Sequence, residues 1–123
     1  MSWTTWIGLG SVLAGLSVGF GAFGAHGLKG RVSAEDLVIF ETAARYQMYH
    51  ALALIGVGLI GTKVDGALIR LAGAFFLVGS IVFSGSLYVL VLAGQRWMGM
   101  ITPFGGLLLI LGWVVLAWSF LRL

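Results

Sequence analysis

The sequence predicts an all-α integral membrane protein, a four-helix bundle with an interfacial amphipathic segment before the second span. The first observation is composition, because 60% of the 123 residues are hydrophobic and 9% are charged, with a mean hydropathy of +1.09. Soluble domains carry about 25% charged residues. The second observation is that four stretches contain no Asp, Glu, Lys or Arg: residues 1–28, 46–62, 71–95 and 97–121. Each reaches or nearly reaches the roughly 20 residues that a helix needs to cross a bilayer.

The whole chain, residues 1–123, is expected to form a single transmembrane domain, because the connections between the apolar stretches leave no room for a soluble domain. We call the membrane face next to the two termini side A and the opposite face side B. The first predicted span covers residues 3–25 and runs from side A to side B. Small residues recur every four positions along it, at Ser11, Gly15 and Gly19. This ridge predicts close contact with another helix.

The second helix is predicted to begin after Ser33, whose hydroxyl suits an N-cap with Asp36 three residues later. Residues 34–45 mix charged and apolar side chains, which is typical of an interfacial amphipathic segment. Residues 46–62 are uncharged and form the second predicted span, which returns to side A. The two parts are expected to be continuous.

Two further spans follow, at residues 67–92 and 103–120. The fourth begins with the pair Thr102 and Pro103, which suits a helix start, and it carries Trp113 toward side A. Lys and Arg are divided almost evenly between the two sides, so the positive-inside rule does not orient the chain.

Polar residues of all four helices are predicted to meet on side B. The chain direction brings the end of the first helix, the start of the second, the end of the third and the start of the fourth to that side. The candidate ligand- or partner-binding residues are His26, Glu41, Arg45, Tyr46, Tyr49, His50, Ser84, Tyr88 and Thr102. Glu41 precedes Arg45 by four residues, which is the favoured order for an ion pair within a helix.

Several readings of this cluster remain open. The simplest is structural: an ion pair at the headgroup level and hydrogen-bonded histidines. The leading functional reading is non-enzymatic binding of a lipid, a quinone or a partner protein. An alternative is a small transporter or channel that moves protons or a small solute past Glu41, Tyr49 and His50, since ionisable residues within spans are functional candidates. A bis-histidine haem or metal protein would need His26 and His50 to face each other. No third histidine and no cysteine accompanies them, so we assign no cofactor and no metal site.

Enzymatic activity is not expected, because the sequence contains no nucleophile motif, phosphate-binding loop or paired carboxylates. The net charge of +3 comes from scattered bases, so no nucleic-acid partner is predicted. The expected partners are membrane lipids, and a unit this small with glycine ridges favours a homo-oligomer or a larger membrane complex.

Four ordered blocks of sequence resemble a known family. They are residues 21–28 (GAFGAHGL), 41–52 (ETAARYQMYHAL), 83–88 (FSGSLY) and 101–106 (ITPFGG). The chain resembles in these blocks the YgdD-like small membrane proteins, domain-of-unknown-function family 423, which also includes the animal transmembrane protein 256. The resemblance implies a multi-pass protein of the bacterial inner membrane, or of the mitochondrion in animal relatives. It implies no established activity and no catalytic or binding residues.

Overall fold

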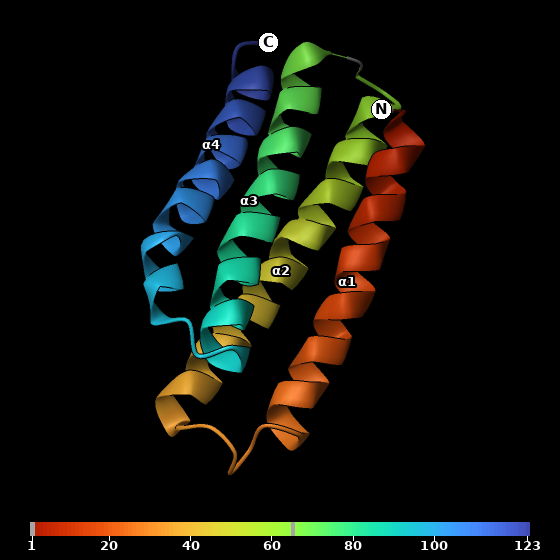
Figure 1. The fold of residues 1–123 in the computed structure, drawn as a ribbon. Helices are drawn as coiled ribbons and strands as arrows, with labels where there is room; N and C mark the ends of the chain where they lie inside the picture. Colours follow the sequence, from red (N-terminus) through yellow and green to blue (C-terminus); the bar gives the residue numbers. More distant parts are fainter. Residues whose placement is uncertain (1, 65) are drawn as a thin grey trace.

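The protein is all-helical in the computed structural model, which describes residues 2–64 and 66–123. Its elements are α1 (Trp3–His26), α2 (Ala34–Gly61), α3 (Ala67–Leu92), the short 3-10 helix η1 (Arg96–Met100) and α4 (Thr102–Leu121). They stand side by side in chain order, as Figure 1 shows. The predicted fold class is confirmed, and no strand occurs in the described residues.

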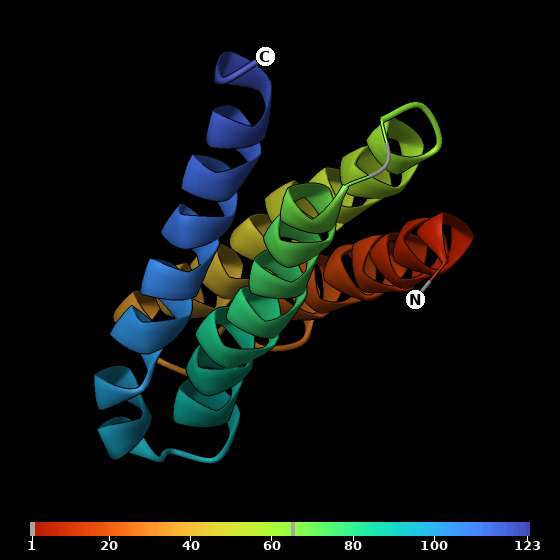
Figure 2. The ribbon, with the colours of Figure 1, turned by 90° about the horizontal axis from the view of Figure 1, so that it is seen from above.

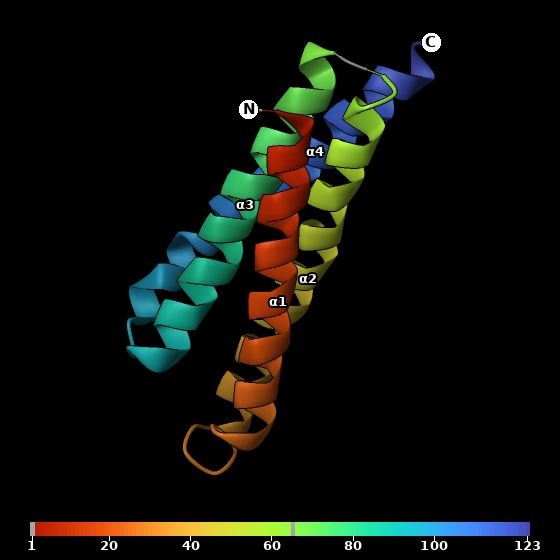
Figure 3. The same ribbon diagram turned by 90° about the vertical axis from the view of Figure 1, so that its right-hand side faces the viewer.

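The four helices form two antiparallel pairs. We call α1 and α2 the first hairpin and α3 and α4 the second hairpin. The start of α1 and the end of α4 lie at one end of the molecule, which corresponds to side A, and the α1–α2 connection and η1 lie at the other (Figure 1). The two hairpins cross at an angle, as the views in Figures 2 and 3 show.

Three helical segments are long and apolar enough to cross a membrane: Trp3–His26, Ala67–Leu92 and Arg96–Leu121. α2 is not among them, because its first half carries charged side chains and several polar ones. The second span over residues 46–62 therefore stays a prediction. Residues 34–45 are continuous with the rest of α2, and they bury Phe40, Ala43 and Ala44.

α1 packs on α2 through positions seven residues apart. A Cβ atom at Gly10 would lie 2.6 Å from the carbonyl oxygen of Ala51, and one at Gly24 would lie 2.8 Å from the ring of Phe40. Between them, the buried Ser17 hydroxyl donates a hydrogen bond to a carbonyl of α2. A seven-residue repeat keeps one seam of a helix on its partner, and small residues let the two backbones approach closely.

The predicted ridge of Ser11, Gly15 and Gly19 is therefore not the one that packs. All three residues are exposed, and a Cβ atom at Gly15 or Gly19 would meet nothing within 4 Å. The prediction of a helix contact at this ridge is wrong within this chain. The cause is geometric: a four-residue repeat and the seven-residue seam lie on different faces of α1.

Two apolar clusters fill the interior. The larger cluster joins all four helices toward side A and consists of Trp6, Leu54, Val57, Ile69, Ala72, Phe76 and Leu109. The smaller lies toward side B and consists of Leu28, Phe40, Leu90 and Val91. Glycines also bring the second hairpin together, since a Cβ atom at Gly112 would lie 2.7 Å from the ring of Phe76. Most of the buried polar groups lie between these two clusters, in the side-B half of the bundle.

Candidate functional site

The predicted site residues belong to the helix ends and half-helices expected on side B, but they divide between two different faces of α2. Glu41, Arg45 and Tyr49 lie on an exposed face, and Tyr46 is also exposed. The nine residues therefore do not form one cluster. The spacing in the sequence places Glu41, Arg45 and Tyr49 on a different face of the helix from His50, but it does not show which face is buried.

The exposed ion pair is present as its spacing predicts. Arg45 Nη2 donates a hydrogen bond of 2.7 Å to Glu41 Oε1. The two side chains remain largely open, with exposed fractions of 52% for Arg45 and 66% for Glu41. Tyr46 is turned toward the second hairpin, and its ring stacks on Phe83 with the ring centroids 5.1 Å apart.

His50 is buried and both of its ring nitrogens are occupied. The indole Nε1 of Trp113 lies 3.0 Å from His50 Nε2, and the carbonyl oxygen of Tyr46 lies 2.7 Å from His50 Nδ1. Because an indole N–H can only donate, Nε2 accepts and Nδ1 carries the hydrogen that it donates to Tyr46. Trp113, which we expected to mark the side-A end of its helix, instead contacts the middle of α2. The imidazole is thus neutral and fully hydrogen-bonded.

The two histidines are far apart. Gln47, one turn before His50, bonds to the carbonyl of Leu13 on α1, and His26 is 13 residues further along that helix. At about 1.5 Å per residue, this separation along the helix is about 20 Å. His26 is exposed at the end of α1. The arrangement therefore gives no support to a shared haem or metal ion, and the described residues contain no group of three or more His, Cys, Asp or Glu side chains that could hold a metal.

Ser84 and Thr102 join helices. The buried Ser84 hydroxyl donates a 2.7 Å hydrogen bond to the carbonyl oxygen of Ala43, which links α3 to α2. The hydroxyls of Thr102 and Ser86 lie 2.6 Å apart and link α4 to α3. These contacts satisfy polar groups that would be costly if left unpaired in an apolar interior.

Gln47 is the central polar residue of the interior, and sequence reasoning missed it. Its Nε2 donates to the carbonyl oxygen of Leu13 at 2.8 Å, and its Oε1 accepts from the hydroxyl of Tyr88 at 2.6 Å. One amide therefore connects α1, α2 and α3. The sequence signal that could have identified Gln47 was a side-chain amide at the start of an uncharged span.

A second ion pair, also missed, joins the two hairpins. Arg96 Nη1 and Nη2 donate to the two carboxylate oxygens of Asp36 at 2.9 and 2.7 Å. The Asp36 side chain is only 11% exposed, whereas that of Arg96 is 61% exposed. The hydrogen bond from Arg96 lowers the pKa of Asp36 below its usual value, and the loss of solvent around the carboxylate opposes part of this shift. The sequence indicates Asp36 only as part of a helix start.

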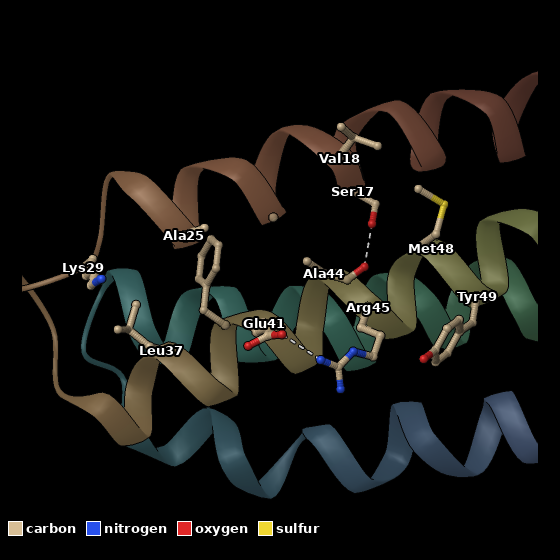
Figure 4. A pocket seen from close by; sticks show the side chains of 13 residues that line it. Ser17, Val18, Ala25, Lys29, Leu37, Glu41, Ala44, Arg45, Met48 and Tyr49 are labelled. Atoms are coloured by element: carbon tan, nitrogen blue, oxygen red, sulfur yellow. Dashed lines mark hydrogen bonds and ion pairs between the residues drawn. The ribbon is translucent and has the colours of Figure 1, made fainter.

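An open groove of about 550 Å³ lies between α1 and α2 on the face that carries Glu41 and Arg45. Figure 4 shows Ala25 of α1 on one side of it and Leu37 and Met48 of α2 on the other. The lining residues are Ser17, Val18, Gly21, Gly24, Ala25, Lys29, Leu37, Phe40, Glu41, Ala44, Arg45, Met48 and Tyr49. Its α1 wall is formed mostly by glycine, alanine and serine. The absence of large side chains from this wall creates the space. The volume falls in the range of about 300–1,000 Å³ that is typical of small-molecule sites.

The groove is elongated along the helices. Leu37 and Tyr49 mark its ends on α2, and 12 residues at about 1.5 Å each give a length of about 18 Å. Lys29 lies at the end next to the α1–α2 connection, and the Glu41–Arg45 pair follows one edge (Figure 4). Charged groups therefore border an otherwise apolar space.

The geometry separates the residues that a transport path would need. Glu41 and Tyr49 line the groove, whereas His50 is buried and turned toward Trp113 of α4. Toward side A, the larger apolar cluster fills the space between the helices. The arrangement suits the binding of an amphiphile from the side better than the movement of a solute through the molecule.

Comparison with known proteins places the chain in a family of membrane proteins. The family model described as "Protein of unknown function (DUF423)" matches residues 20–106. A UPF0382 membrane protein of Staphylococcus aureus is 48% identical over 110 residues, which cover 88% of both chains. The UPF0382 membrane protein YwdK of Bacillus subtilis is 41% identical over 109 residues, or 88% of this chain and 89% of the relative. No solved structure matches. The chain therefore belongs to the DUF423 family, whose UPF0382 members are membrane proteins of unknown function.

Proposed function

We propose that this protein is a non-enzymatic lipid-binding protein of the cell membrane, and that the groove between α1 and α2 holds one acyl chain of a membrane lipid. The observation that carries the proposal is the groove itself: an open space of about 550 Å³ with a glycine- and alanine-rich wall on one helix. Its length of about 18 Å is close to half of the roughly 30 Å hydrocarbon core, which is the depth of one leaflet.

Lipid is favoured over a quinone or a partner helix by the shape of the groove and by its edge. A helix has a diameter of about 10 Å with its side chains and needs a broader surface than a narrow channel between two packed helices. A quinone ring calls for hydrogen-bond partners around a flat pocket, whereas the polar groups here stand along one edge and at one end. An acyl chain needs apolar walls and nothing more.

Gly21 offers a direct test, because it lines the groove and a Cβ atom there would meet nothing within 4 Å. Gly21→Leu should fill the groove without disturbing the helices, and replacing a helical glycine also favours the helix. We expect wild-type protein extracted in mild detergent to carry lipid in native mass spectrometry, and Gly21→Leu to retain less than about one tenth of it.

Gly19→Leu is the matched control. Gly19 is exposed on the same helix, its Cβ position is equally open, and it does not line the groove. This variant should carry as much lipid as wild type. Equal lipid content in a folded Gly21→Leu variant and in wild type would refute the proposed function.

A further inference from the structure

We infer that the groove selects a phospholipid whose headgroup carries a single net negative charge, and that Lys29 binds its phosphodiester at the outer end of the groove while Arg45 contributes its positive charge from the groove edge. This inference rests on the proposed function and names the class of lipid. Three of the lining residues are charged: the cations Lys29 and Arg45 and the anion Glu41. The lining therefore has a net charge of +1, which an anionic phospholipid neutralises and a zwitterionic one leaves uncompensated.

Lys29 is free to bind a ligand. It is exposed, lies at the outer end of the groove (Figure 4), and makes no hydrogen bond or ion pair with the described residues. That end of the groove is next to the α1–α2 connection, where α1 leaves the apolar stretch. A lipid with its chain between the helices would place its headgroup there.

Arg45 retains N–H donors that could bind a ligand. A guanidinium carries five N–H groups, and the structure assigns one of them to Glu41. The Arg45 side chain is 52% exposed along the groove edge. Glu41 therefore restrains the guanidinium without using up its capacity for a phosphate, and guanidinium and phosphate are well matched in geometry. Long basic side chains can also extend along an apolar surface toward a headgroup.

The other basic residues at this end differ from these two. Arg96 is held by Asp36 through two hydrogen bonds. Arg31 is exposed in the same connection as Lys29, only two residues away, but it does not line the groove. The structure thus supplies a matched control of equal charge and nearly equal position.

The test is a lipid competition in mixed micelles that contain equal amounts of phosphatidylglycerol and phosphatidylcholine, read by native mass spectrometry. Wild type should bind phosphatidylglycerol in preference. Lys29→Gln and Arg45→Gln should each lower that preference about fivefold. This is about the change in affinity that one basic group near a membrane surface contributes. Arg31→Gln should change it less than twofold, and all three variants should melt close to wild type.

An equal loss in Lys29→Gln and Arg31→Gln would overturn the inference, because the preference would then come from general surface charge. Displacement of phosphatidylglycerol by inorganic phosphate alone would also overturn it, because the site would then recognise the anion and not a lipid. Gly21→Leu distinguishes the two proposals. If it abolishes lipid binding while Lys29→Gln leaves the preference unchanged, acyl-chain binding stands and the headgroup assignment fails.

Discussion

The two ion pairs at the side-B end of the molecule differ in almost every respect. Asp36 and Arg96 are 60 residues apart, are joined by two hydrogen bonds, and bury the carboxylate. Glu41 and Arg45 are one helical turn apart, share one hydrogen bond, and leave both side chains more than half exposed. The first pair joins the two hairpins at their side-B end. The second leaves the hairpins unconnected, so its charges remain available for a ligand.

Asp36→Asn should have the largest effect, because it leaves the guanidinium of Arg96 without its counter-charge across the contact between the hairpins. We expect the melting temperature in detergent to fall by about 5 °C or more. Arg96→Gln should have a similar effect. Combining the two substitutions should cost little more than either alone, because both remove the same interaction. Additive losses would show that the pair does not join the hairpins.

Acid should weaken the first pair in a defined direction. Arg96 lowers the pKa of Asp36 in the folded protein, so the pair contributes stability above the unfolded pKa of about 3.9 and loses it as pH falls through the lower folded value. The difference in melting temperature between wild type and Asp36→Asn should therefore be constant near pH 7 and shrink below about pH 4. A difference that grows in acid would contradict this assignment.

Glu41→Gln should have the smallest effect on stability. Exposed pairs one turn apart contribute about 0.3–0.5 kcal/mol, and glutamine can still accept a hydrogen bond from Arg45. The melting temperature should change by less than about 2 °C. A loss as large as that of Asp36→Asn would remove the contrast between the two pairs and would assign Glu41 to the architecture of the fold.

Local signals in the sequence were reliable. Ser33 caps α2 as expected, since its hydroxyl accepts a hydrogen bond of 3.1 Å from the backbone N–H of Asp36. Pro103 lies in the first turn of α4, and the Glu41–Arg45 pair follows from its spacing. Each of these features depends on residues within one turn of a helix, so neighbouring positions in the sequence suffice to predict it.

Contacts between helices were not predictable in the same way. His50 with Trp113, and Gln47 with Tyr88, depend on how each helix is rotated about its axis. Rotation is normally read from a polar face, and α3 and α4, which carry Tyr88 and Trp113, are too apolar to show one. The groove could not be predicted for a related reason. It exists because small residues line it, and in the sequence Gly21 and Gly24 can equally indicate the end of a helix.

The separation of Asp36 from Arg96 also sets an order of assembly. Ribosomes add residues from the N-terminus, so the first hairpin is complete 35 residues before Arg96 is made. Its own seam of Gly10, Ser17 and Gly24 can form during that interval. The carboxylate of Asp36 has no guanidinium partner in this pair until α3 and Arg96 have been synthesised. Closure of this pair therefore follows the synthesis of the first hairpin and of α3, and it does not require α4.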